Sequence, residues 1–175
     1  YDLAYSPDSN WVAAAASRSN KVVLYNRSAA ESEESEESAQ TEIVLDAKLY
    51  AIDFSPDSTQ IATADLDGYV RFWDLATGEE VGELDNGQPL RGLAYNPDGK
   101  SIAASISGQI IIWDIASQQQ IATLNHPGAL DTIVYSADGS LLATASSENT
   151  IYLWDVNNDY ALLPNTLVMT STPYS

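Results

Sequence analysis

His126 is the only histidine of the chain, and the chain has no cysteine. An imidazole can act as a general base or bind a transition metal, but both roles need partners. No second histidine and no thiolate can complete a zinc site, and no Ser-His-Asp pattern or glycine-rich phosphate loop stands out. We therefore expect no catalytic residue, no metal and no cofactor, and interpret His126 as structural.

Four aspartates are the next candidates, because carboxylates bind calcium or act in pairs as acid and base. Each stands in the same kind of turn, three residues after an aromatic residue: Asp8, Asp57, Asp98 and Asp138. One carboxylate per turn, repeated along the chain, is typical of capping of nearby backbone N–H groups. The sequence therefore favours a structural role for these carboxylates over a calcium site.

These turns belong to a unit that occurs four times. The turn aromatics are separated by 49, 41 and 40 residues: Tyr5, Phe54, Tyr95 and Tyr135. A second marker closes each unit, at separations of 48, 40 and 41 residues: Tyr25-Asn26, Trp73-Asp74, Trp113-Asp114 and Trp154-Asp155. Two markers that keep one period define an internal repeat of about forty residues.

Each unit contains several short runs with strand character, separated by turn residues. In the second unit, strands are predicted over residues 50–54, 60–64, 69–74 and 80–84. Proline presets φ in the first turn of this unit, and Gly68 permits a tight second turn. Many short strands without helical periodicity indicate an all-β fold, and the period near forty favours a radial arrangement over a sandwich.

The repeat resembles the WD40 family, whose units end in Trp-Asp and carry an aromatic-Ser-Pro-Asp-Gly turn. The resemblance covers residues 1–155 and implies an all-β β-propeller segment of four WD40-type, four-stranded blades. The blades are expected at about 1–45, 46–84, 85–124 and 125–169, with the last outer strand within 160–169. Family rings usually close with about seven blades. We therefore expect the chain to be part of a larger ring, completed by further blades of the same chain or another copy.

Family units often contain a hydrogen-bonded tetrad of His, Ser or Thr, Asp and Trp. The fourth unit supplies a nearly complete structural tetrad, with Glu in the place of Asp: His126, Thr144, Glu148 and Trp154. The second unit keeps Thr63, Asp67 and Trp73 but has Leu45 at the histidine position. The resemblance therefore predicts that the fourth blade is the most rigid.

Seven basic and 25 acidic residues give a net charge of −18. This charge disfavours the phosphate backbone of nucleic acid and an anionic membrane surface as partners. Glutamates and serines alternate within residues 29–41, which are predicted to form a disordered loop. This loop is either a solvated insertion, an acidic segment for a basic partner, or a phosphorylation target.

The resemblance implies a non-enzymatic scaffold that binds a protein or peptide partner, with a basic partner suited to the charge. Family partners typically contact the loops that precede the inner strands and those between the second and third strands. The partner-binding candidates on this rim are Tyr50, Leu66, Asp67, Arg91 and Asp131. Two alternatives stay open: a structural or sensor segment of a larger multidomain protein, and a propeller that binds a ligand in its central channel.

Overall fold

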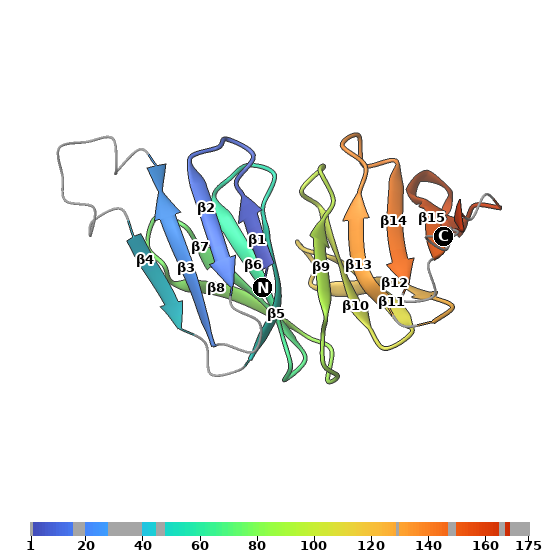
Figure 1. The fold of residues 1–175 in the computed structure, drawn as a ribbon, viewed down its shortest axis with the longest axis horizontal. Helices are drawn as coiled ribbons and strands as arrows, with labels where there is room; N and C mark the ends of the chain where they lie inside the picture. The colour runs from blue at the N-terminus through green and yellow to red at the C-terminus, as the bar shows by residue number, and fades with distance from the viewer. Residues whose placement is uncertain are drawn as a thin grey trace, which may run out of the picture.

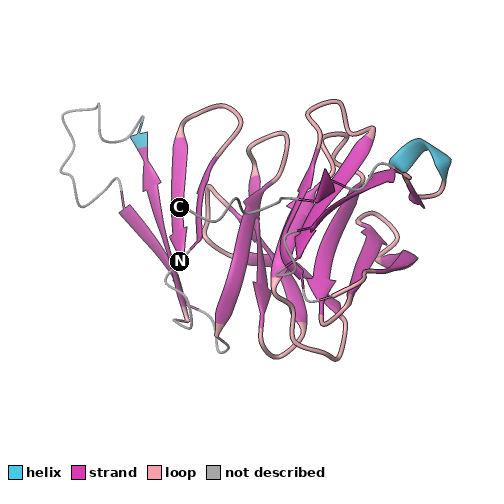
Figure 2. Ribbon diagram, turned by 45° about the vertical axis from the view of Figure 1, so that its right-hand side comes forward, coloured by secondary structure: helices cyan, strands magenta, loops and turns pink. Residues whose placement is uncertain are grey.

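The computed structural model describes residues 2–15, 20–27, 40–44, 48–128, 130–146, 150–164 and 167–168. Strands joined by tight turns make up nearly all of this part, together with a 3-10 turn at Val156–Asn158 (Figure 2). No helix within these ranges is long and apolar enough to cross a membrane. Of the predicted disordered loop, residues 29–39 lie outside the described residues, whereas Gln40 and Thr41 belong to a strand.

The strands form four antiparallel sheets, which we call blades 1 to 4 in chain order. Blade 1 contains β1 (Asp2–Tyr5), β2 (Trp11–Ala15), β3 (Lys21–Asn26) and β4 (Gln40–Val44). Blade 2 contains β5 (Leu49–Phe54), β6 (Gln60–Asp65), β7 (Tyr69–Asp74) and β8 (Glu80–Asp85). Blade 3 contains β9 (Gly92–Tyr95), β10 (Ser101–Ile106), β11 (Gln109–Asp114) and β12 (Gln119–Asn125). Blade 4 contains β13 (Leu130–Tyr135), β14 (Leu141–Ser146), β15 (Thr150–Asp155), β16 (Ala161–Leu162) and β17 (Leu167–Val168).

Within each blade the strands pair in chain order, and in blade 4 both β16 and β17 pair with β15. The first strands of the blades, β1, β5, β9 and β13, lie next to one another at the inner side of the assembly (Figure 1). The predicted all-β class with four four-stranded blades is thereby confirmed.

The core consists of three apolar layers, one between each pair of neighbouring blades. Side chains alternate between the two faces of a strand, so a blade between two others must be apolar on both faces. One face carries small and aliphatic residues, such as Ala13 and Leu24 of blade 1. The opposing face of the next blade brings the turn aromatic and the closing tryptophan, Phe54 and Trp73 in blade 2. This pairing recurs in the other two layers and fixes the order of the blades.

In each aspartate turn the residue directly after the aspartate has a left-handed backbone conformation. This residue has a φ of 62° at Ser9, 59° at Ser58, and 71° at both Gly99 and Gly139. In each turn the carboxylate accepts the N–H group two residues further on, at 2.8–3.1 Å: Asp8, Asp57, Asp98 and Asp138. A side chain at position 139 would also lie 2.7 Å from the Asn96 amide oxygen of the neighbouring blade, so glycine is needed there for space as well.

Carboxylates also join the inner strands of neighbouring blades. The N–H group of Ile52 donates to Asp2 at 2.9 Å, and that of Tyr95 donates to Asp53 at 2.7 Å. Inner strands are sheet edges, whose free N–H groups need acceptors when they are buried. Burial raises the pKa of Asp53 to about 6, although the N–H groups of Tyr95 and Phe54 partly offset this effect.

The outward face of blade 1 is built like a blade interface but has no blade against it. Tyr5 of this face is 69% exposed, whereas the equivalent Phe54, Tyr95 and Tyr135 are 3–8% exposed. Leu3 and Tyr25 are likewise 64% and 41% exposed. An apolar surface of this kind marks a site of association.

We expect this face to drive self-association. Light scattering at micromolar concentrations should report a mass above that of the 18.9 kDa monomer. The double variant Leu3→Ser/Tyr5→Ser should shift the mass toward the monomer without loss of the cooperative thermal transition. A wild-type chain that stays monomeric at high concentration would contradict the interpretation of this face as an interface.

The second expectation concerns Asp53 and pH. The pKa of Asp53 is about 6 in the folded protein and 3.8 ordinarily. At pH values between these two, the carboxyl group is therefore largely protonated in the folded state and largely ionised in the unfolded state. The unfolding free energy of the wild type therefore falls as the pH rises from 4 to 6. In Asp53→Asn this loss disappears, so the stability of the variant relative to wild type should rise by about 2–3 kcal/mol from pH 4 to pH 7.

Urea denaturation at several pH values measures this difference. Asp138→Asn is the control, because hydrogen bonds from Ser136 and Ser140 lower the pKa of Asp138 to about 2. The stabilisation by that carboxylate is lost as the pH falls, so its variant should show a pH dependence of opposite sign. If the stability relative to wild type changed with pH in the same direction for both variants, the raised pKa of Asp53 would be contradicted.

Candidate functional site: the rim of blades 2 and 3

Three predicted rim residues occupy one equivalent position, four residues before each turn aromatic: Tyr50, Arg91 and Asp131. In blades 2 and 4 this position is a β-bulge, where the register of the inner strand shifts between Leu49 and Ala51 and between Leu130 and Thr132. A bulge leaves one residue out of the ladder and bends the strand. Arg91 immediately precedes β9, and its N–H group donates to the Ser105 carbonyl at 2.9 Å. The rim residues are therefore held by backbone geometry.

The structure brings two of these residues into contact across the boundary between blades 2 and 3. The guanidinium of Arg91 lies 5.9 Å from the centroid of the Tyr50 ring. Arg91 is exposed and Tyr50 is half-buried, so the pair offers a cation and an aromatic edge to solvent. The side chain of Asp131 lies outside the described residues.

Leu66 and Asp67 form the β6–β7 turn beside this pair. The N–H group of Leu66 donates to the Lys48 carbonyl at 2.9 Å, and that of Leu90 donates to the Asp65 carbonyl at 3.0 Å. These bonds tie together the three chain segments that precede β5, β7 and β9. Leu66 is half-buried, whereas Asp67 and Lys48 are exposed.

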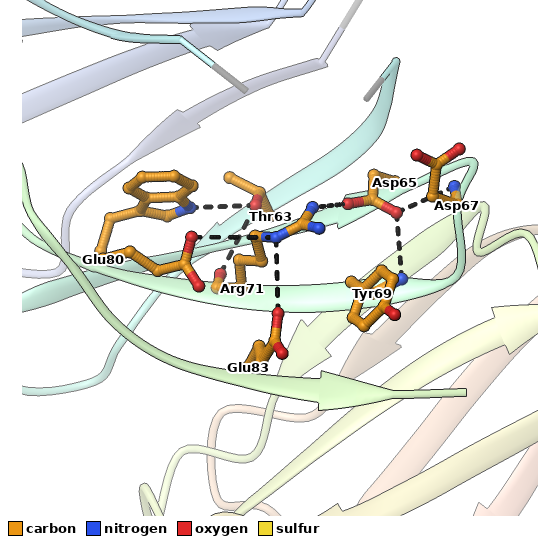
Figure 3. A network of polar contacts seen from close by, with 8 residues as sticks. Thr63, Asp65, Asp67, Tyr69, Arg71, Glu80 and Glu83 are labelled. Carbon is orange, nitrogen blue, oxygen red and sulfur yellow. Dashed lines mark hydrogen bonds and ion pairs between the residues drawn. The ribbon is translucent and has the colours of Figure 1, made fainter. Parts of the chain in front are cut away.

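A buried carboxylate, that of Asp65, lies beside this turn and is bonded to it (Figure 3). Asp65 Oδ1 accepts the N–H groups of Asp67 and Tyr69, both at 3.0 Å, and Oδ2 is paired with the guanidinium of Arg71. The side chain of Asp65 is fully buried and that of Arg71 is 16% exposed. Glu80 and Glu83 on β8 approach the same guanidinium at 3.8 Å. The network joins β6, β7 and β8 and fixes the position of the turn.

The Asp65 network corrects the expectation for blade 2. Asp67 was predicted to be the tetrad acid, but its side chain is exposed, and Asp65 is the buried acid instead. The sequence does carry a signal for it. Thr63 and Asp65 are two residues apart on one strand face, and Arg71 pairs with Thr63 across the ladder. Asp65, Arg71 and the rim cation Lys48 are functional or supporting residues that sequence reasoning missed.

Blades 2 and 4 share one hydrogen bond of the expected tetrad. The indole N–H groups of Trp73 and Trp154 donate to the hydroxyls of Thr63 and Thr144, each at 3.1 Å. The equivalent positions of the other blades are occupied by Ala14 and Ala104, which have no hydroxyl.

His126 lies beside this bond in blade 4 but is held differently from the expected tetrad. Its Nδ1 is 3.3 Å from the Gly128 carbonyl, and its ring packs edge-on against Tyr152 at 4.7 Å. Nε2 is buried and has no hydrogen-bond partner among the residues that the structure describes. Burial lowers the pKa of His126, which favours the neutral ring. Glu148 lies outside the described residues. The largest charged network within the described residues is that of Asp65 and Arg71 in blade 2.

A groove of about 650 Å³ follows the inner strands. It is the place where a central-channel ligand would bind. The lining is mainly apolar, and its carboxylate, Asp53, already accepts two backbone N–H groups. The groove therefore offers little for specific recognition of a polar small molecule.

The network makes a prediction about stability. Arg71→Met leaves the buried Asp65 carboxylate without its cation and should lower the unfolding free energy by about 3 kcal/mol in urea denaturation. Addition of Asp65→Asn should restore at least about 1 kcal/mol, because the amide oxygen can still accept from Asp67 and Tyr69. The exposed Lys21–Glu42 pair is the control, and Lys21→Met should cost less than about 0.5 kcal/mol. Equal costs for Arg71→Met and Lys21→Met would contradict the role of the network.

Comparison with known proteins identifies the repeat. The family model described as "WD domain, G-beta repeat" matches four stretches, residues 1–26, 41–74, 78–114 and 118–155. Among curated proteins, the chain is 36% identical over 56 residues to eukaryotic translation initiation factor 3 subunit I of Aspergillus fumigatus. The protein of that name from Neosartorya fischeri is 34% identical over 56 residues. Each match covers 32% of this chain and 16% of the relative. The first match covers β1 to β3, and each later match begins with the outer strand of one blade and ends with the third strand of the next. These four matches cover more than half of the chain and place it in the WD40-repeat family.

Proposed function

We propose that this chain is a non-enzymatic scaffold that binds a protein partner on the rim of blades 2 and 3. The WD40 repeats imply a protein-interaction scaffold. The contact of Arg91 with Tyr50 at the junction of two blades is the observation that supports this particular surface. Tyrosine and arginine are enriched among the residues that dominate protein interfaces.

Rigidity supports the same surface. The rim segments are joined by backbone hydrogen bonds, and the β6–β7 turn is held by the Asp65 network. A surface that is already ordered loses little conformational entropy when it binds. Arg91 and Lys48 supply donors and Asp67 supplies an acceptor, so a polypeptide segment with mixed polar groups suits the rim.

The proposal extends to assembly. The uncovered face of blade 1 needs a further blade, from the same chain or from another copy, and the matched relatives are named as subunits of a larger factor. From these relatives we infer only that this chain is a subunit of a protein assembly, because the matching stretch covers about a sixth of the relative's length. The charge of −18 supports a protein partner over nucleic acid or an anionic membrane.

Affinity capture from cell extract with quantitative mass spectrometry tests the proposal. Proteins retained by the wild type should be depleted about tenfold with Arg91→Ala and with Tyr50→Ala, because truncation of a central contact costs 1 kcal/mol or more. Lys21→Ala removes another exposed positive charge, on β3 of blade 1, and should retain the same proteins. Retention that is the same for all three variants would contradict the assignment of the rim as the binding surface.

A further inference from the structure

The phenol of Tyr95 is a buried polar group without a partner. Tyr95 is 7% exposed, and its hydroxyl has no hydrogen-bond partner within the described part of the chain. It lines a groove of about 310 Å³ between blades 2 and 3, at the ends of the blades that carry the aspartate turns. These ends are opposite to the rim. Because an unsatisfied buried hydroxyl costs free energy, such groups are uncommon unless something binds to them.

The equivalent positions in the neighbouring blades differ from Tyr95 in their hydrogen bonding. At the junction of blades 3 and 4, the hydroxyl of Tyr135 lies 3.3 Å from the hydroxyl of Tyr160 and is also bonded to Ser101. At the junction of blades 1 and 2 the position is Phe54, which has no hydroxyl. Among the turn aromatics that the structure describes at the three junctions, only Tyr95 has a hydroxyl without a hydrogen-bond partner.

The groove around Tyr95 is acidic. Asp57 and Asp98, both exposed, stand on its two sides, one from each blade. The Asp57 carboxylate is close enough to contribute to the raised pKa of Tyr95. Hydrogen bonds from Ser55 and Thr59 lower the pKa of Asp57, so this carboxylate is ionised at neutral pH. The remaining lining combines the polar Thr59 and Gln60 with the apolar Pro56 and Ile115.

We propose that this groove, which we call the lower groove, receives an arginine side chain from a partner polypeptide. The guanidinium would donate to the Tyr95 hydroxyl and to the carboxylates of Asp57 and Asp98. Its flat faces would contact Pro56 and Ile115.

Guanidinium chemistry fits the lower groove better than other cations. A guanidinium has five N–H donors in a plane, enough for one phenol and two carboxylates, and it tolerates desolvation better than an ammonium group. The backbone N–H group of Lys100 donates to Asp98 at 2.8 Å, and the exposed side chain of Lys100 adds a positive charge on the same turn. The surrounding charge of −18 attracts a basic segment from a distance. The site is separate from the rim, so its occupancy does not depend on whether the rim binds a partner.

Nuclear magnetic resonance with N-acetylarginine amide as the probe tests the lower groove. Titration into ¹⁵N-labelled protein should cause saturable shifts of the amides of Thr59, Gln60, Asp98 and Gly99. N-acetylcitrulline amide has the same shape without the charge and should cause little change. The turn of Asp138 is an internal control, because it is equally acidic but its junction is already closed by Tyr160.

The variant Tyr95→Phe separates a binding role from a structural one. Phenylalanine already occupies this position in blade 2, so the variant should fold. It should weaken binding of the arginine probe about fivefold and leave the Tm unchanged or raised, since it removes an unsatisfied hydroxyl. Tyr135→Phe removes a bonded hydroxyl and should lower the Tm. Asp98→Asn should also weaken binding, Lys100→Ala should strengthen it, and Arg91→Ala on the rim should leave it unchanged.

Several outcomes would overturn the proposal. Equal shifts with the citrulline probe would show that the charge is not recognised. Shifts that spread equally over the Asp138 turn would show unspecific attraction of a cation to an acidic protein. Unchanged binding of the arginine probe by Tyr95→Phe would show that the hydroxyl takes no part in binding. A marked fall in the Tm of this variant would show that the hydroxyl has a structural role.

Discussion

The packing of one blade face against the next is the interaction on which the rest of this structure depends. Aromatic residues of each blade, such as Phe54 and Trp73, cover small and aliphatic residues of the preceding blade. Burial of apolar area is the main favourable term in folding, and here it acts only between blades, because a single four-stranded sheet has no interior of its own. The blade order, the rim at the junction of blades 2 and 3 and the lower groove all follow from this packing. So does the exposure of Tyr5, whose equivalents are buried because a preceding blade covers them.

The acidic composition has a structural purpose as well as an effect on solubility. Aspartates accept backbone N–H groups in the turns, in the links between inner strands and below the rim. Carboxylates that accept backbone N–H groups in this way are those of Asp2, Asp8, Asp53, Asp57, Asp65, Asp74, Asp85, Asp98, Asp114, Asp138 and Asp155. Short connections leave many N–H groups without ladder partners, and a carboxylate is the strongest acceptor for them. Hydrogen bonds lower the pKa of the turn residues Asp8 and Asp74, so these carboxylates stay charged at neutral pH.

The candidate sites lie where the repeats differ from one another, whereas the fold depends on what they share. Tyr50 and Arg91 occupy one repeat position but are different residues, and their contact exists only because blades 2 and 3 are neighbours. Phe54, Tyr95 and Tyr135 likewise share a position, and only Tyr95 has a hydroxyl without a partner. A scaffold of equivalent units can thus carry a distinct binding surface at each junction while the packing between blades stays the same.

The sequence by itself determined that the chain contains four repeats of short strands, and the resemblance to the WD40 family implied the strand order and the rim positions of Tyr50 and Arg91. Two markers with one period, and strand faces that alternate every two residues, are local properties that a single chain displays directly. Only the tertiary structure decided that Asp65 rather than Asp67 is buried, that His126 packs on Tyr152, and that the Tyr95 hydroxyl has no partner. These outcomes depend on which side chains of neighbouring strands and blades reach the same space. That choice is made by distances across the sheet and between sheets, which the spacing of residues along the chain does not contain.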